Sequence, residues 1–195
     1  MNLQKHLDRA EQALQKGRAE FAVELCDQVL DVSPGDARAA GLLTQAALEI
    51  AKEGAGGVFS KLGAVSSGLV AGLGKLTRRP EAEASARRRG FLKNPVDFQR
   101  GYLWADALER SGETAAALEA FAALAAVDGE SAKRAGALAT ACGQIDRALE
   151  MYEEALARDP RDTEAIRARK NLAAEQALRK QDTSDDAFGG LGLPS

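Results

Sequence analysis

Small and bulky residues recur at fixed spacings in three segments of the chain. In each segment a glycine is followed by further pattern residues at offsets of 5, 9, 13 and 17. The three series are Gly17, Ala22, Cys26, Leu30 and Pro34; Gly112, Ala117, Phe121, Ala125 and Gly129; and Gly143, Ala148, Tyr152, Leu156 and Pro160. Steps of four residues keep to one face of a helix, the leading glycine ends the preceding helix, and the closing Pro or Gly ends the helix itself. Asp36 and Asp162 follow closing prolines and are placed to cap the next helices.

This pattern predicts an array of helix pairs. Residues 3–16 and 18–32 form a pair, 36–53 is a further first helix, 95–111 pairs with 113–127, 130–142 pairs with 144–158, and 162–180 closes the array. Aromatic residues make up only 5% of the chain, which also favours closely packed helices over a β-sandwich or barrel. Because the last repeat of an array must present a polar outer face, the basic residues of 162–180 suit a capping helix.

The segments 17–34, 112–129 and 143–160 resemble the second helix of the tetratricopeptide repeat (TPR), a helix pair of about 34 residues. The third segment matches best, at Ala148, Tyr152, Ala155, Leu156 and Pro160. Cys26 replaces the family's aromatic residue in the first segment, and the first-helix signature is weak throughout. The resemblance covers residues 3–53 and 94–180. It implies an all-α, TPR-like solenoid of about three repeats.

The resemblance also implies a binding surface, because TPR first helices line a concave face that holds a peptide or a helix. The family's main contact positions correspond here to Arg38, Gln45, Gln99, Tyr102, Asp106, Arg110 and Lys133. Trp104 and Phe98 are expected in the core, whereas Tyr102 suits either the core or a partner contact. A clamp for a terminal carboxylate is not expected, since Ala137 stands where that subfamily needs Asn.

Residues 54–93 interrupt the repeats with a Gly-rich, basic insertion that has eight Lys/Arg and only two Asp/Glu. A helical apolar stripe runs through residues 58–76, and its possible membrane or partner contacts are Val58, Phe59, Leu62, Val65, Leu69 and Leu73. The stripe suits a second helix of repeat two, an interfacial helix on an anionic membrane, or a loop that orders on a partner. Arg87, Arg88 and Arg89 are further candidate contacts. Nucleic acid is not expected, since no series of stacking aromatics accompanies them.

The rest of the chain adds an acidic tail and no catalytic pattern. Residues 181–195 hold three Asp and no Lys or Arg, and we expect them to be a solvated terminus or a motif that docks on a partner or on the basic insertion. His6 is the only histidine, and Cys26 and Cys142 form no metal-binding motif. Both cysteines are expected to be buried in helices in a reducing compartment. We see no secretory signal at the N-terminus and no stretch long enough to span a membrane.

The sequence therefore predicts a non-enzymatic, cofactor-free adaptor whose partner is another protein, in a bacterial cytoplasm. Its expected regions are 1–53, 54–93, 94–180 and 181–195. The alternative is a peripheral membrane-associated assembly factor anchored by residues 58–76. Homo-oligomers formed by stacking of incomplete repeats also remain open.

Overall fold

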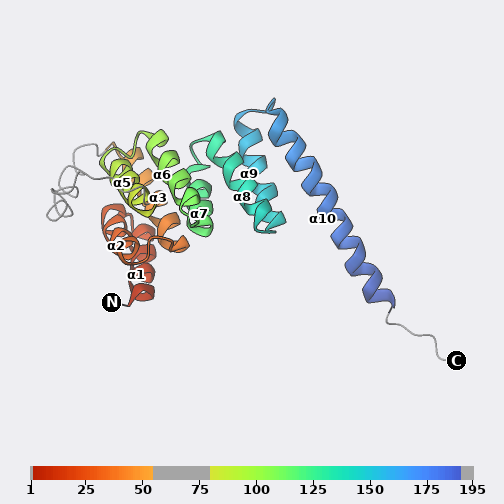
Figure 1. The fold of residues 1–195 in the computed structure, drawn as a ribbon, viewed down its shortest axis with the longest axis horizontal. Coiled ribbons are helices and arrows are strands. Elements are labelled where there is room, and N and C mark those ends of the chain that lie inside the picture. Colours follow the sequence, from red (N-terminus) through yellow and green to blue (C-terminus); the bar gives the residue numbers. More distant parts are fainter. Residues whose placement is uncertain (1, 55–79, 190–195) are drawn as a thin grey trace.

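The computed structural model describes residues 2–54 and 80–189, and every regular element in these ranges is an α-helix. The helices are α1 (Leu3–Gln15), α2 (Ala19–Val32), α3 (Ala37–Lys52), α5 (Pro80–Lys93), α6 (Phe98–Arg110), α7 (Thr114–Leu124), α8 (Gly129–Ala141), α9 (Ile145–Arg158) and α10 (Thr163–Gly189). They stack into an elongated array, with the N-terminus at one end and α10 projecting from the other (Figure 1). The predicted all-α, TPR-like fold is confirmed. The stripe predicted over residues 58–76 lies outside the described residues.

The turns inside the helix pairs are built by glycines, as the repeat pattern predicted. Gly17, Gly112 and Gly143 have φ angles of 68°, 88° and 72°, a backbone region that residues with a Cβ rarely adopt. In each case the residue after the glycine donates its N–H to a carbonyl five residues back, over 2.8 Å, 3.0 Å and 2.9 Å. Carbonyls at the helix end thereby gain partners, and the chain reverses into the next helix.

Three of the turns between repeats, at residues 33–36, 94–97 and 159–162, share a second design, with Pro at their second position and Asp at their fourth. The N–H of Asp36 donates to Ser33, that of Asp97 to Asn94, and that of Asp162 to Asp159, over 3.1–3.2 Å. The Asp36 and Asp162 side chains cap the following helices, as expected. The turn at 94–97 lies partly inside a predicted helix, so the predicted start at residue 95 is wrong and α6 begins at Phe98. The sequence of this turn, Asn-Pro-Val-Asp, is that of a repeat boundary. α5 is therefore the second helix of the repeat before α6.

The helices do not pack in strict chain order. α3 packs against α2 and then against α7, whereas α5 packs against α6. The array therefore runs α1, α2, α3, α7, α8, α9 and α10. α5 and α6 attach to it through the packing of α6 on α7 and through ion pairs between α5 and α2. The crossing of α3 and α7 is close, because a Cβ added at Gly41 would lie 3.3 Å from the Cβ of Glu119. α7, which is distant from α3 in the sequence, is therefore its neighbour in the array.

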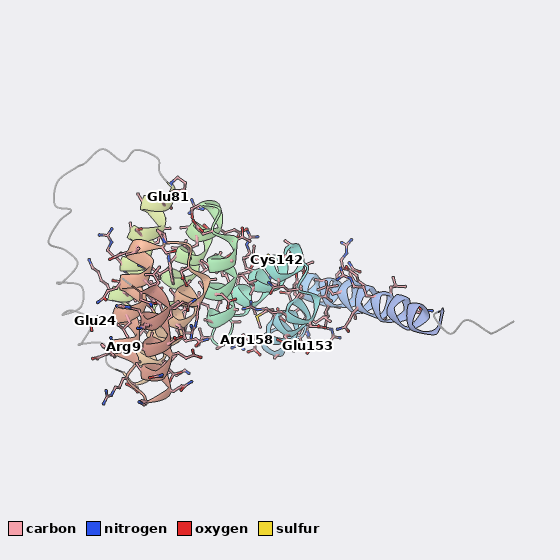
Figure 2. All side chains as sticks on the ribbon, turned by 90° about the horizontal axis from the view of Figure 1, so that it is seen from below. Arg9, Glu24, Glu81, Cys142, Glu153 and Arg158 are labelled. Carbon is pink, nitrogen blue, oxygen red and sulfur yellow. The ribbon has the colours of Figure 1, made fainter. Side chains whose placement is uncertain are left out.

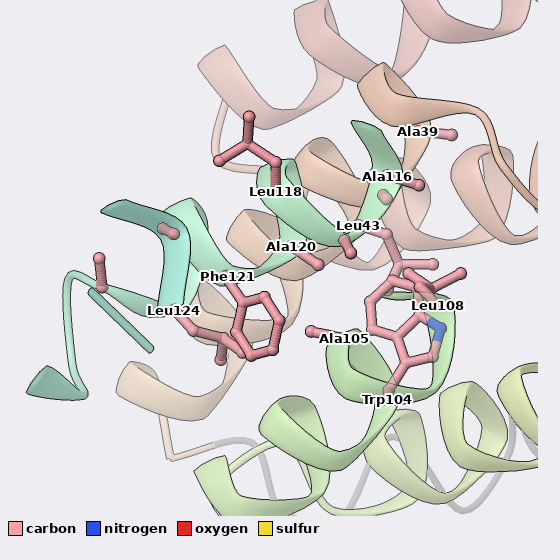
Figure 3. Close-up of a cluster of buried hydrophobic side chains, with 14 of the residues drawn as sticks. Ala39, Leu43, Trp104, Ala105, Leu108, Ala116, Leu118, Ala120, Phe121 and Leu124 are labelled. Atoms are coloured by element: carbon pink, nitrogen blue, oxygen red, sulfur yellow. The ribbon is translucent and has the colours of Figure 1, made fainter. Parts of the chain in front are cut away.

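The core is centred on α7, which contacts α3, α6 and α8. Figure 3 shows Phe121 and Leu124 of α7 in one cluster with Trp104 of α6 and Leu43 of α3. Trp104 is buried as expected, and its ring stacks on that of Phe91 with 6.1 Å between centroids. Phe98 does not join this core. It is 37% exposed, because it is the first residue of α6 and adjoins the exposed turn at Val96.

A buried arginine ties α5 to α2. Arg88 is only 3% exposed, and its guanidinium forms ion pairs with Asp27 and Asp31. Its Nε lies 2.8 Å from an Asp27 oxygen, but at an angle that makes no hydrogen bond, so both atoms are buried without one. Burial raises the pKa of Asp27 even though the positive charge of Arg88 opposes the shift. At this α2–α5 junction the charged groups therefore lie close together, but not all of their buried polar atoms are hydrogen-bonded.

Two further expectations need correction. The last helix was predicted to end at residue 180, but α10 continues to Gly189, because extending an established helix adds one hydrogen bond per residue. Cys26 is buried, and burial raises its pKa to about 12. Cys142, however, is exposed, since it lies at the C-cap of α8 instead of on its buried face. No helix within residues 2–54 or 80–189 is long and apolar enough to cross a membrane.

Candidate protein-interaction surface

One face of α6 carries most of the predicted contact residues. Gln99, Tyr102, Asp106 and Glu109 follow one another at steps of three or four, so they share a face of the helix. Glu109 binds Arg134 of α8 through two hydrogen bonds of 2.9 Å and 2.7 Å, which fixes α8 beside this face. We call the surface formed by Gln99, Tyr102, Asp106 and Arg134 the α6–α8 surface.

Tyr102 is the aromatic residue of this surface. Its ring is partly buried and meets the ring of Phe121 edge-on, with 5.2 Å between centroids and 66° between planes. Burial, assisted by the negative charge of Glu130, raises the pKa of its hydroxyl, which therefore stays protonated at neutral pH. That hydroxyl has no hydrogen-bond partner among the residues that the structure describes. The α6–α8 surface thus presents a fixed ring with a free donor and acceptor.

Two neutral amides are also free for an incoming chain. Gln99 on α6 and Gln45 on α3 are exposed, and neither side chain is hydrogen-bonded to any part of the chain that the structure describes. An amide offers both donors and an acceptor, which suits the N–H and C=O groups of a peptide backbone. Gln45 lies on a different part of the array, because α3 packs chiefly against α2 and α7.

The charged residues predicted as contacts are already engaged within the chain. Arg110 binds Glu83 of α5 through hydrogen bonds of 3.1 Å and 3.0 Å, and its Nε lies 2.9 Å from Asp106. The Arg110 guanidinium is the main cause of the lowered pKa of Glu83. These pairs fasten α5 to α6 at the edge of the α6–α8 surface. They leave Arg110 half-exposed but electrostatically satisfied.

Arg38 and Lys133 join first helices to their neighbours in the same way. Arg38 of α3 pairs with Asp8 at 2.8 Å and with Glu11, both on α1. Lys133 of α8 lies 2.9 Å from Glu130 and 3.0 Å from Asp162, which precedes α10, and these two carboxylates raise its pKa. Sequence reasoning placed both residues on the first-helix faces but could not show that their charges are internally paired.

Sequence reasoning missed two residues that shape the array. Arg134 forms the edge of the α6–α8 surface, and Arg147 of α9 binds Glu119 of α7 through hydrogen bonds of 2.6 Å and 2.7 Å. Each arginine lies more than twenty residues from its partner, so no local spacing signals the pair. Arg134 adjoins Lys133, and a systematic look at charged neighbours of the family positions would have included it.

The candidate contacts of the insertion fall into two groups. Val58, Phe59, Leu62, Val65, Leu69 and Leu73 lie outside the described residues. Arg87 and Arg89 are exposed on α5 and are accessible to a partner. Arg88 is buried and paired with Asp27 and Asp31, so it belongs to the α2–α5 junction and not to an exposed basic surface.

The α6–α8 surface combines one aromatic ring with neutral and internally paired polar groups. Within residues 2–54 and 80–189, no group of three or more His, Cys, Asp or Glu residues could hold a metal ion. The Nδ1 atom of His6 lies 3.0 Å from the carbonyl oxygen of Asn2 on the exposed first turn of α1. What the surface offers is an aromatic ring, one free amide (Gln99) and ion pairs that are already satisfied.

No protein-family profile matches the sequence, and none of the curated proteins is similar to it in sequence. Several solved structures are similar. MamA has a TM-score of 0.45 at 16% identity, covering 99% of this chain and 98% of MamA. YrrB, described as a TPR protein with an unusual peptide-binding site, has a TM-score of 0.42 at 21% identity, covering 85% and 90%. TTC0263, a thermophilic TPR protein of Thermus thermophilus, has a TM-score of 0.40 at 18% identity, covering 88% and 97%. The turns and helix pairs described above show by themselves that the fold of this chain is TPR-like.

Proposed function

We propose that the protein is a non-enzymatic interaction scaffold that binds a peptide or helix of a partner protein on the α6–α8 surface. The observation that carries this proposal is Tyr102. Its ring is held by Phe121, its hydroxyl is free, and it lies on α6, which the Arg134–Glu109 ion pair joins to the next first helix, α8. Partly buried tyrosines with a polar end are frequent anchors at protein interfaces.

The state of the neighbouring charges favours a peptide of low charge. Arg110, Asp106 and Arg134 are occupied by partners within the chain, so a strongly charged ligand would have to displace existing pairs. Gln99 and the Tyr102 hydroxyl need no such displacement. An extended segment or one face of a helix can therefore bind through its backbone groups and one apolar side chain packed on the Tyr102 ring.

The other predicted contacts take supporting parts in this proposal. Gln45 provides a second free amide on α3 for a ligand that reaches along the array. Arg38 and Lys133 hold α3 to α1 and α8 to α10, and so set the spacing of the first helices. A scaffold needs this rigidity, because ordering its own surface on binding would reduce affinity.

Selection from a displayed peptide library on the full-length protein tests the proposal. Selected peptides are then titrated by calorimetry against the wild type and Tyr102→Ala. Loss of an interface anchor costs about 2 kcal/mol or more, so we expect affinity to fall by about thirtyfold. Tyr102→Phe keeps the ring and should lose much less. Gln99→Ala should give an intermediate loss.

Phe21→Ala is the matched control, because Phe21 is an exposed aromatic residue on α2, away from α6 and α8. It should leave peptide affinity unchanged. Equal binding of the selected peptides to wild type and to a folded Tyr102→Ala variant would contradict the proposal. So would a selection that returns no sequence family above background.

A further inference from the structure

The outer face of α1 at the N-terminal end of the array carries an exposed basic stripe. Lys5, Arg9, Gln12 and Lys16 lie at offsets of 4, 7 and 11 along α1 and its C-cap, so they share one face. We call these four residues the α1 basic stripe. Beside it, Arg18 and the exposed ring of Phe21 help to line a surface pocket of about 120 Å³ together with Arg9, Gln12 and Lys16.

The charges of this stripe have no carboxylate partner in the part of the chain that the structure describes. Arg9 lies over the Phe21 ring at 5.7 Å from its centroid, but none of Lys5, Arg9, Lys16 or Arg18 has a carboxylate within 4 Å among the described residues. The acidic residues of α1 itself, Asp8 and Glu11, are taken by Arg38. Residues 55–79 contain no Asp or Glu, so that segment offers no neutralising carboxylate. In contrast, Arg38, Arg110, Arg134 and Arg147 are all paired.

The opposite end of the molecule carries a segment of complementary charge. α10 packs on α9 mainly through Ala165, Ala168 and Leu172, and the bond between Gln176 and Asp146 extends this attachment. Beyond that point the helix continues to Gly189, and Leu178 is 63% exposed. Leu178, Asp182, Asp185 and Gly189 are spaced by 4, 7 and 11 residues, the same offsets as the α1 basic stripe.

One chain cannot join these two regions within itself. Figure 2 places Arg9 at one end of the array, and α10 points away from the other end. α10 has 27 residues, which at 1.5 Å per residue makes it about 40 Å long, so its acidic end projects well beyond the array. A contact between the acidic end and the α1 basic stripe must therefore join two molecules.

We propose that the end of α10 in one molecule docks on the α1 basic stripe of another, so that molecules associate head to tail. Asp182, Asp185 and Asp186 pair with Arg9 and Lys16 of the stripe and with the neighbouring Arg18, and Leu178 supplies an apolar contact for the Phe21 pocket. The occupant is the end of α10 from a second copy, because the charge of that end, its helical spacing and its projection from the array all fit the stripe. Such a contact uses two different surfaces, so it builds open chains or rings instead of closed dimers.

Sedimentation of the full-length protein over a range of concentrations tests this inference. We expect the average mass to rise with concentration at low ionic strength. The rise should be largely lost near 1 M salt, where the Debye length falls to about 3 Å. Arg9→Glu/Lys16→Glu/Arg18→Glu should weaken association by about tenfold or more, because three exposed attractive pairs become repulsive.

Charge reversal at a distant site is the matched control. Arg167, Arg169 and Lys170 are exposed on α10 before its projecting part, and Arg167→Glu/Arg169→Glu/Lys170→Glu changes the net charge by the same amount. This variant should still associate. Circular dichroism of each variant verifies that the helices are retained.

A charge exchange gives the sharpest test. Asp182→Lys/Asp185→Lys/Asp186→Lys should also fail to associate alone. A mixture of this variant with the stripe-reversed variant should associate again, because each then offers a surface complementary to the other. The inference is overturned if the wild type stays monomeric at every concentration, if the control variant loses association equally, or if the mixture does not recover it. It is also overturned if reversal of the stripe charges abolishes binding to anionic vesicles but leaves self-association unchanged.

The α1 basic stripe and the α6–α8 surface are separate, so the two proposals fail independently. Stripe reversal should leave peptide affinity unchanged, and Tyr102→Ala should leave self-association unchanged.

Discussion

α7 and α10 show two different ways in which a helix belongs to the same array. α7 has only 11 residues, yet seven of them are buried, because α3, α6 and α8 surround it. α10 has 27 residues, but among those whose side chains are described only Ala165 and Leu172 are buried. The length of a helix in this protein therefore says little about how much of the core it holds.

The comparison separates a helix that stabilises the array from a helix that leaves much of its surface exposed. α7 joins α3 to α6 and α8, so changes in α7 affect the whole molecule. α10 is held at its first turns by Asp162 and Lys133 and by a short apolar strip against α9. Its far end is the part that we propose docks on another molecule. The elements that move or bind are commonly those with few buried contacts.

Truncation of a core residue in each helix should show the difference in stability between α7 and α10 most clearly. Phe121→Ala in α7 removes a fully buried ring and should lower the free energy of unfolding by about 3–5 kcal/mol. Leu172→Ala in α10 should cost about 2 kcal/mol, at the low end for a buried leucine, because α9 covers it on one side only. Urea denaturation followed by circular dichroism measures both.

The two variants should also differ in where they loosen the structure. Hydrogen exchange should accelerate throughout the array in Phe121→Ala but only in α10 in Leu172→Ala. Similar losses of stability in the two variants would mean that α10 is as integral to the core as α7, and the comparison would fail.

The sequence could predict the pairs but not the order in which they pack. The glycine-led series located α1, α2, α8 and α9 well, since helix pairs and their turns depend on local spacing. The packing of α3 against α7 depends on the close approach of Gly41 to Glu119. These two residues are far apart in the chain, so no local spacing signals their contact. The boundary at residues 94–97 was readable, because it repeats the Pro and Asp positions of 33–36 and 159–162. Tyr102 could be selected from the repeat, but the pairing of Arg134 with Glu109 could not.

The α2–α5 junction gives the second prediction, since it fixes how the α5–α6 pair attaches to the array. Arg88→Ala leaves Asp27 half-buried without its positive partner and should cost about 3 kcal/mol, the low end for a broken buried pair, because Asp31 is largely exposed. Chemical denaturation gives the magnitude, and hydrogen exchange of α5 gives the location. Arg87→Ala, one residue away on the exposed face, is the control and should cost only a few tenths of 1 kcal/mol. Equal effects of the two variants would show that Arg88 does not fasten α5.

The smallest expected effect is a pH dependence that distinguishes α10 from α7. N–H groups at the start of α10, Ala165 first, together with Lys133 lower the pKa of Asp162 below its ordinary value of 3.8. A lowered pKa contributes stability that is present above 3.8 and is lost as the pH falls through the folded-state value. Acidification below pH 3.8 should therefore loosen α10 before α7, and hydrogen exchange corrected for the intrinsic rate at each pH measures this. Asp162→Asn keeps a capping side chain but cannot titrate, so α10 in that variant should lose most of its pH dependence. If wild type and Asp162→Asn loosen in parallel on acidification, another carboxylate controls the attachment of α10.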